Sequence, residues 1–144
     1  MNIGFVNATQ ADIQPIFEQC KSLIDAYEDI TSIDYDKVIA WLKLKIQTNI
    51  SKYTVIMLGE EKAGYYCLDR QGDKWELDDF YIFPDYRGKG IGTAVLHHVC
   101  DKTDGCIFLC VFRKNTGAIS LYRRFGFEAV KVVSDTRQIM ERPG

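Results

Sequence analysis

Residues 74–93 combine acidic side chains with a glycine-rich turn, a pairing that could remove a proton and bind a phosphate group. Three carboxylates, at Glu76, Asp78 and Asp79, lie on one predicted strand. The chain then runs into a helical pattern through Pro84-Asp85-Tyr86-Arg87-Gly88-Lys89-Gly90-Ile91-Gly92-Thr93. Glycines at such a junction let the backbone approach a ligand, and the first N–H groups of a helix attract phosphates. The segment therefore favours a pyrophosphate group.

The spacing of the glycines argues against two familiar phosphate-binding loops. A dinucleotide fingerprint requires G-x-G-x-x-G, but Gly88 and Gly90 are followed by Thr93 where the third glycine would stand. The P-loop sequence G-x-x-x-x-G-K-[ST] does not occur. A glycine-rich turn alone is weak evidence, so a second motif is needed.

Two motifs together resemble the signatures of the GNAT superfamily of N-acetyltransferases. Arg87-x-x-Gly90-x-Gly92, preceded by an aromatic-rich strand and Pro84, resembles its acetyl-CoA-binding signature. The second motif is Asn115-x-x-Ala118-x-x-Leu121-Tyr122-x-x-x-Gly126-Phe127, which follows in the expected order. The resemblance in motifs is strong from about residue 75 to 128, and before that only the order of elements matches. It implies acetyl transfer from acetyl-CoA to a primary amine by direct attack in a ternary complex, without a metal.

The resemblance also implies roles for individual residues toward acetyl-CoA. Backbone groups of Phe80, Tyr81 and Ile82 would pair with pantetheine as with an added strand. Asn115 would hydrogen-bond the cofactor arm, and Tyr122 would lie near the thioester sulfur. The pyrophosphate would be held by the amides of Arg87, Gly88, Lys89, Gly90, Ile91, Gly92 and Thr93.

Acyl transfer to an amine needs a group that removes the ammonium proton, whose pKa is about 10.4, and a group that protonates the departing thiolate. Tyr122 could donate to the thiolate, and the N–H of Ile82 could donate to the thioester oxygen. Glu76 and Asp78 are equally good candidates for the base, with Asp79 third. The apolar alternation of this strand slips by one residue at Asp78 and Asp79. The slip predicts a β-bulge, although an edge strand with two solvated carboxylates would give the same pattern.

The acceptor is expected to be a small amine or a polyamine-like molecule, with a cationic one favoured over an anionic one. Residues 25–36 hold five acids and no Lys or Arg, and an acidic rim would attract a cation. A solvated helix end and loop explains the same residues and is the more common case. Nearby aromatic residues could contact the substrate or belong to the core, namely Tyr27, Tyr35 and Trp41. Alternatives are a protein or peptide amine, a longer acyl chain, or an acyl-CoA sensor without turnover.

The elements that would position these residues form a mixed α/β sheet. Apolar spacing predicts helices from Thr9 or Asp12 to Tyr27, after Asp34, from Gly90 to about Asp101, and near Gly117–Phe125. Strands are predicted at 3–7, 53–58, 63–68, 74–82 and 106–112, with two more at the end. A block of strands followed by a strand-helix-strand crossover predicts a mostly antiparallel sheet flanked by helices, with splayed central strands implied by the resemblance. No linker divides residues 1–144, which are expected to form one domain.

Composition narrows the remaining classes of function. The chain has 144 residues and a formal charge of -2, with no long basic run, which argues against nucleic acid. It has no run of 18 apolar residues and no signal-like N-terminus, so a cytoplasmic protein away from membranes is expected. Five cysteines without a C-x-x-C pair indicate reduced thiols rather than a zinc site. A thiol mechanism would need His97 or His98 beside Cys100, and an exposed sheet edge leaves a monomer or a homodimer open.

Overall fold

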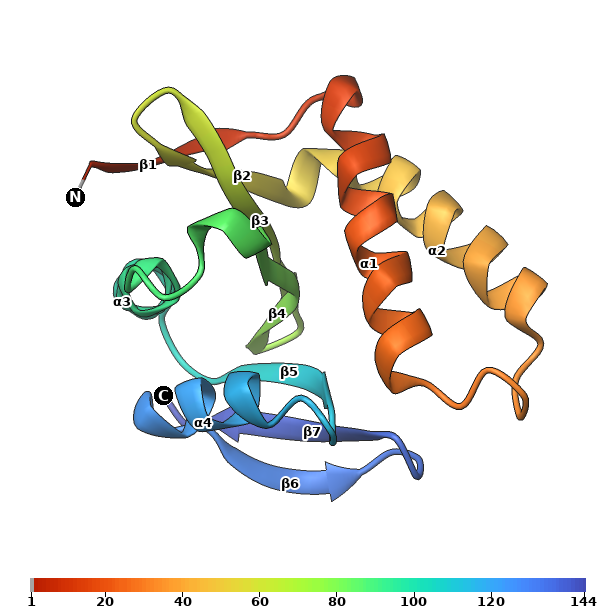
Figure 1. Cartoon of the computed structure of the whole chain (residues 1–144). Helices are drawn as coiled ribbons and strands as arrows, with labels where there is room; N and C mark the ends of the chain where they lie inside the picture. The colour runs from red at the N-terminus through yellow and green to blue at the C-terminus, as the bar shows by residue number, and fades with distance from the viewer. Residues whose placement is uncertain (1) are drawn as a thin grey trace.

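One seven-stranded sheet organises residues 2–144, the part of the chain that this computed structural model describes (Figure 1). The strand order is β1-β2-β3-β4-β5-β7-β6, and every neighbouring pair is antiparallel except β4 and β5. The strands are β1 (Ile3–Asn7), β2 (Tyr53–Leu58), β3 (Glu61–Gln71), β4 (Lys74–Ile82), β5 (Ile107–Phe112), β6 (Glu128–Val132) and β7 (Arg137–Arg142). The expected mixed, mostly antiparallel fold is confirmed.

Four α-helices flank the sheet, and three short 3-10 turns lead into or out of its elements. The helices are α1 (Ile13–Tyr27), α2 (Tyr35–Asn49), α3 (Ile91–Lys102) and α4 (Thr116–Arg124). The 3-10 turns are η1 (Gln10–Asp12), η2 (Ile50–Lys52) and η3 (Pro84–Tyr86). Helix α2 begins after Asp34 as predicted, and the Asp34 carboxylate caps it by accepting from the N–H of Lys37 at 3.3 Å. In α1, Pro15 falls in the first turn, where its missing N–H costs nothing.

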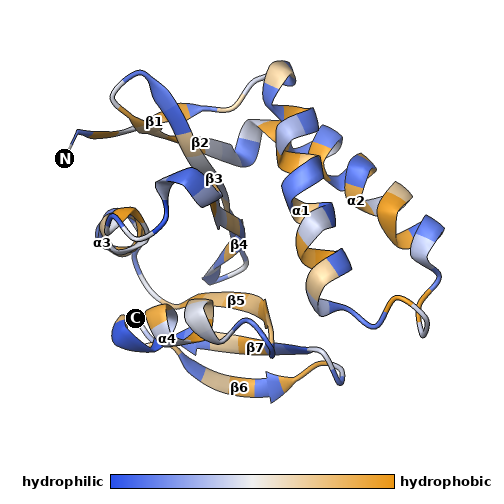
Figure 2. Cartoon of the chain, in the orientation of Figure 1, coloured by the Kyte–Doolittle hydropathy of each residue, from blue (hydrophilic) through white to orange (hydrophobic). Residues whose placement is uncertain are grey.

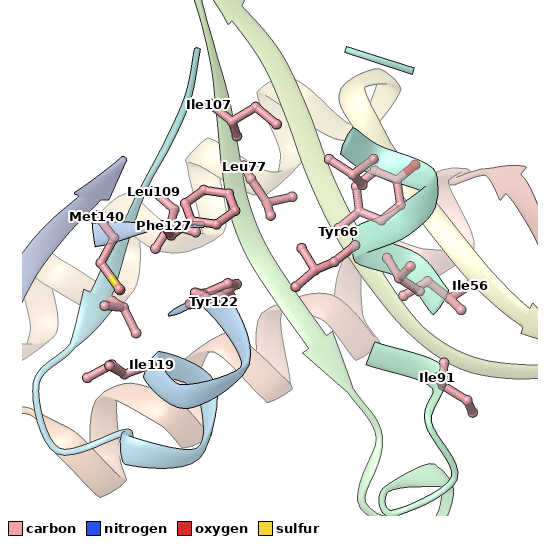
Figure 3. Packing of buried hydrophobic residues seen from close by; sticks show 14 of the residues in the cluster. Ile56, Tyr66, Leu77, Ile91, Ile107, Leu109, Ile119, Tyr122, Phe127 and Met140 are labelled. Carbon is pink, nitrogen blue, oxygen red and sulfur yellow. The ribbon is translucent and has the colours of Figure 1, made fainter. Parts of the chain in front are cut away.

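Two apolar clusters, one on each face of the sheet, hold the layers together. One includes α3 and α4, through the buried Ile91 of α3 and the buried Tyr122 of α4 (Figure 3). The other cluster joins α1 and α2 to the opposite face through Ile16 and Ile46. Figure 2 shows both polar and apolar residues along α1 and α2, as expected for helices with one buried side. Among residues 2–144, no helix combines the length and hydropathy that a bilayer crossing requires.

Strand β4 contains the predicted bulge. Its register against β3 shifts between Tyr65 and Cys67, and Asp79 adopts a left-handed backbone conformation with φ 49°. This change of direction places Leu77 and Phe80 with the α3–α4 cluster even though they are three residues apart. A strand without the bulge would send one of them to the opposite face.

Strands β4 and β5 separate immediately after they meet. They pair only at Trp75 with Ile107 and at Glu76 with Phe108. Beyond these two pairs, the facing edges of both strands have no partner strand among the described residues 2–144. Figure 1 shows β4 and β5 diverging, with α4 on the side of β5 and β7. The sheet therefore opens at its centre, where a ligand can pair with backbone groups.

Candidate active site

The larger cavity of the site, of about 660 Å³, lies where β4, the glycine loop, α1 and α4 come together. Most of the predicted cofactor-binding residues line it, namely Phe80, Tyr81, Ile82, Arg87, Gly88, Gly90, Gly92, Thr93, Asn115 and Tyr122. Lys89 and Ile91 do not line this cavity, and the Ile91 side chain is buried in the core. Ile91 can therefore contribute only its backbone N–H group.

The loop before α3 presents six consecutive N–H groups without an acceptor in residues 2–144. They belong to residues 88–93, and backbone bonding resumes when Ala94 donates to the Gly90 carbonyl at 3.2 Å. Gly88 and Gly90 have φ values of +74° and +79°, and a Cβ at either would meet nothing within 4 Å. The loop is therefore an open row of donors at a helix N-terminus, which fits the pyrophosphate of acetyl-CoA.

The edge of β4 that faces the gap can hold an extended arm of a ligand. The N–H of Phe83 donates to the Ala63 carbonyl on β3 at 2.8 Å. Because successive strand N–H groups point in opposite directions, the N–H of Ile82 faces the side of β5. The Ile82 carbonyl already accepts from Arg87 Nε at 3.0 Å. Ile82 is thus one free donor on the edge expected to pair with pantetheine.

Asn115 caps α4 and still has polar groups to offer. Its Oδ1 accepts from the N–H of Ala118 at 3.3 Å, which fixes the side chain at the start of the helix. Its Nδ2 group has no hydrogen-bond acceptor within residues 2–144. This amide group is therefore available for a hydrogen bond to the cofactor arm, the role that the resemblance implies for Asn115.

A second cavity of about 290 Å³ adjoins the first, and five residues line both: Leu23, Phe80, Asn115, Ala118 and Tyr122. Tyr122 has a buried ring, with centroids 6.5 Å from Phe80 and 5.6 Å from Phe127. Its hydroxyl makes no hydrogen bond to residues 2–144. Burial raises the pKa of Tyr122 well above the usual value for a phenol, so the group stays protonated as a proton donor must.

Glu76 and Asp78 both line the second cavity, but their surroundings differ. Asp78 Oδ2 lies 2.6 Å from Lys45 Nζ, so this carboxylate is already paired. Glu76 has no hydrogen bond or ion pair with residues 2–144. Burial, followed by the charge of Asp78, raises the pKa of Glu76 above its usual value. An unpaired carboxylate of raised pKa is the better proton acceptor.

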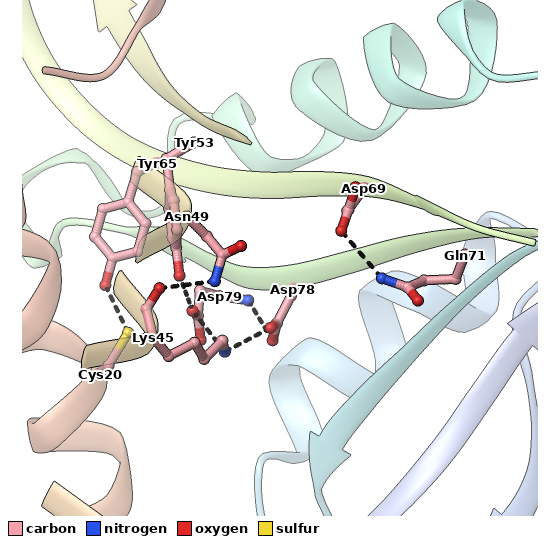
Figure 4. Close-up of polar contacts among 9 residues, drawn as sticks. All are labelled: Cys20, Lys45, Asn49, Tyr53, Tyr65, Asp69, Gln71, Asp78 and Asp79. Carbon is pink, nitrogen blue, oxygen red and sulfur yellow. Dashed lines mark hydrogen bonds and ion pairs between the residues drawn. The ribbon is translucent and has the colours of Figure 1, made fainter. Parts of the chain in front are cut away.

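Lys45 is the residue of this site that sequence reasoning missed. It reaches from α2 to β4, where its Nζ also lies 3.1 Å from Asp79 Oδ2 (Figure 4). The Tyr53 hydroxyl donates to the same Asp79 oxygen at 2.6 Å. Burial lowers the pKa of Lys45, but Asp79 and Asp78 outweigh it, so the net pKa is raised. Sequence contains no signal for this contact, because 33 residues separate Lys45 from Asp78.

The acids of residues 25–36 do not form the expected rim of the acceptor cavity. Asp25 pairs with Lys21 and Tyr35, and Glu28 pairs with Arg137. None of the five acids lines either cavity. The acids beside the cavity come from β4 instead. Of the three aromatic residues considered, Tyr27 lines the first cavity, Trp41 lines the second and Tyr35 lines neither.

The thiols and histidines show no catalytic arrangement. His98 stacks on Phe5 at 3.9 Å between ring centroids, and His97 packs edge-on against Phe125. Neither lines a cavity of the site, and all five cysteines are free thiols. Within residues 2–144, no group of three His, Cys, Asp or Glu side chains could hold a metal ion.

The site combines an open sheet, a row of free amides on one side and a carboxylate-lined cavity on the other. This combination defines the class of transferases that use a coenzyme A thioester. A family model described as the acetyltransferase (GNAT) family matches residues 11–127. The chain therefore belongs to the GNAT acetyltransferase family, and the expected membership is confirmed. Acetyl-CoA is the acyl donor of this family.

Three known proteins illustrate the similarity. The chain is 39% identical to the spermine/spermidine N(1)-acetyltransferase of Bacillus subtilis over 69 residues, which cover 44% of this chain and 45% of that protein. It is 26% identical to the peptidyl-lysine N-acetyltransferase YjaB of Salmonella typhimurium over 105 residues, 73% of this chain and 69% of that protein. Across three of the curated relatives, including the Bacillus protein, the chain spans only 31% to 45% of their length.

The fold matches the PaiA N-acetyltransferase of Thermoplasma acidophilum, solved in complex with coenzyme A. The TM-score is 0.75 with 20% identity, and the match covers 100% of both chains.

Proposed function

We propose that this protein transfers the acetyl group of acetyl-CoA to a primary amine of a small molecule. The observation that carries the proposal is the meeting of two cavities at Tyr122. One cavity is lined by the free amides of the loop, and the other contains the unpaired carboxylate of Glu76. A donor and an acceptor would therefore meet at one phenol.

In this proposal the donor is held mainly by backbone groups. The N–H groups of residues 88–93 bind the pyrophosphate, and the α3 terminus adds its partial positive charge. The edge of β4 pairs with the pantetheine arm, and Asn115 Nδ2 donates to it. Acetyl-CoA supplies an acyl group that is activated as a thioester.

Three residues act on the reacting atoms. Glu76 takes the proton of the acceptor ammonium, directly or through one water, so that the neutral amine can attack. The N–H of Ile82 donates to the thioester oxygen as that oxygen gains negative charge. After attack the nitrogen gives its second proton to solvent, and Tyr122 gives its own proton to the departing thiolate and recovers one from solvent through the cavity. The products are an amide and a free thiol, and no covalent enzyme intermediate is needed.

An assay of thiol release from acetyl-CoA tests this proposal, with panels of small amines, amino acids and peptides as acceptors. We expect turnover with small primary amines and a loss of turnover in Tyr122→Phe. Binding of acetyl-CoA without release on any acceptor would instead indicate a sensor. A preference for peptides would refute the small-molecule acceptor, and the absence of acetyl-CoA binding would refute the whole proposal.

A further inference from the structure

Two aspartates and a tyrosine beside the acceptor cavity form a binding site for one ammonium group. Asp78 Oδ2 and Asp79 Oδ2 lie 2.6 and 3.1 Å from the same Nζ atom. The Tyr53 hydroxyl holds Asp79 at 2.6 Å, and the N–H of Asp79 donates to Asp78 at 2.9 Å. The two carboxylate side chains are only 28% and 15% exposed, so an unpaired charge here would be costly.

In this chain the ammonium is supplied by the protein itself. Lys45 extends from α2, with its backbone carbonyl accepting from Asn49 Nδ2 at 2.8 Å and its Nζ over the Trp41 ring at 5.5 Å from the centroid. All of Trp41, Lys45, Asp78 and Asp79 line the acceptor cavity. The lysine therefore lies where the second ammonium of a diamine could otherwise bind.

The rest of the cavity offers little to a second positive charge. Its other charged groups are Glu76, assigned to the reacting amine, and Arg137, which is paired with Glu28 at 3.3 Å. Most of the other lining is apolar, namely Leu23, Ile24, Trp41, Leu42, Leu77, Phe80, Val111, Phe112 and Ala118. An acceptor with one amine on an apolar body matches this surface, because such an acceptor needs only one carboxylate, that of Glu76.

We propose that Lys45 occupies a second-ammonium subsite and thereby makes this protein select monoamines with an apolar body over diamines. The inference rests on the proposed function, since it names the acceptor class of the same site. Lys45 acts on specificity through the space and the charge that it occupies. Removing both should create a diamine site from residues already in place.

The test compares Lys45→Ala with Lys45→Met in binding and turnover. The probes are alkyl monoamines from propylamine to hexylamine and the matching diamines from diaminopropane to diaminohexane. In the wild type we expect each monoamine to bind at least about tenfold more tightly than its diamine. In Lys45→Ala, the affinity for a diamine relative to the monoamine of matching length should rise by at least about tenfold. Lys45→Met removes the charge but fills the space, so its gain in relative diamine affinity should be much smaller.

Lys37→Ala is the matched control, because Lys37 is another α2 lysine with an 86% exposed side chain that lines neither cavity. It should leave the ratio unchanged. Calorimetric binding keeps the inference testable without turnover. If no amine is acetylated, the proposed function fails, whereas a Lys45→Ala protein that binds diamines no better than the wild type overturns this inference. A wild type that binds diamines as well as monoamines overturns it too, even if the variant does not fold.

Discussion

Replacing Tyr122 with phenylalanine separates the proposed chemistry from the fold. The hydroxyl makes no hydrogen bond within residues 2–144, while the ring is buried against Phe80 and Phe127. Phenylalanine keeps this packing and leaves no protein group without its partner. The free energy of unfolding should therefore change by less than about 1 kcal/mol.

The effect on catalysis should be much larger. A hydrogen bond from the phenol to a developing thiolate is charge-assisted and contributes about 1.5 to 3 kcal/mol. Because this hydrogen bond forms only in the transition state, its loss corresponds to a fall in kcat of about 10- to 150-fold. The KM for acetyl-CoA should change little, because the loop amides that bind the pyrophosphate are untouched. Single-turnover measurements of thiol release isolate the chemical step from product release.

Tyr66→Phe is the matched control for this experiment. Tyr66 is also a buried tyrosine, but it lines neither cavity, and its hydroxyl has no hydrogen-bond partner within residues 2–144. Its removal should leave kcat unchanged and increase the free energy of unfolding by about 1 kcal/mol, because a buried unpaired group is lost. If Tyr122→Phe kept its kcat within about twofold of the wild type, Tyr122 would not be the proton donor.

Three further predictions concern the base, the loop and the fold. Glu76→Gln should lower turnover near neutral pH by about 100-fold. In the wild type, activity should fall toward acid with a pKa that burial raises above the usual glutamate value. This acid limb should be absent from the pH-rate profile of Glu76→Gln. Gly90→Ala should cost about 1 to 2 kcal/mol of stability at its φ of +79° and raise the KM for acetyl-CoA, whereas Gly59→Ala, at φ +62° in a remote turn, should show the stability loss alone. Burial raises the pKa of Asp12, but Lys62 at 2.7 Å contributes to a net lowering. Asp12→Asn should therefore unfold about 1 kcal/mol more easily at neutral pH, with the difference vanishing as pH falls from about 4 through the lowered pKa. Denaturant titrations at several pH values would check this, and a difference that grows in acid would contradict it.

Most of the elements could be predicted because local patterns determine them. The strands at 3–7, 53–58 and 74–82 match the structure, and the one at 63–68 extends to Glu61–Gln71. The bulge was also readable, because its slip in apolar alternation is local to Asp78 and Asp79. The sequence pattern allows either Thr9 or Asp12 as the cap of a single helix. In the structure Thr9 precedes η1 and α1 follows Asp12, so the two residues mark two successive starts.

The acceptor side could not be predicted, because it depends on which distant side chains meet. The acids of residues 25–36 are concentrated in sequence, yet none of them lines either cavity, and Asp25 and Glu28 are paired with Lys21 and Arg137. Lys45 looks in sequence like an ordinary helix-surface lysine. Only the packing of α2 on the sheet, through Leu42 and Ile46, brings it to Asp78 and Asp79 and leaves Glu76 unpaired.

The row of backbone amides at residues 88–93 has a consequence for how the site tolerates mutation. Every residue type except proline has an N–H group, so the donor site depends on the path of the chain more than on side-chain identity. Lys89, for example, could be replaced by many residues without loss of a donor, whereas proline there would remove one. The acceptor cavity is the reverse case, because each of its polar contacts requires a particular side chain. Genetic drift can therefore rewrite which amine is recognised while the same thioester continues to be used.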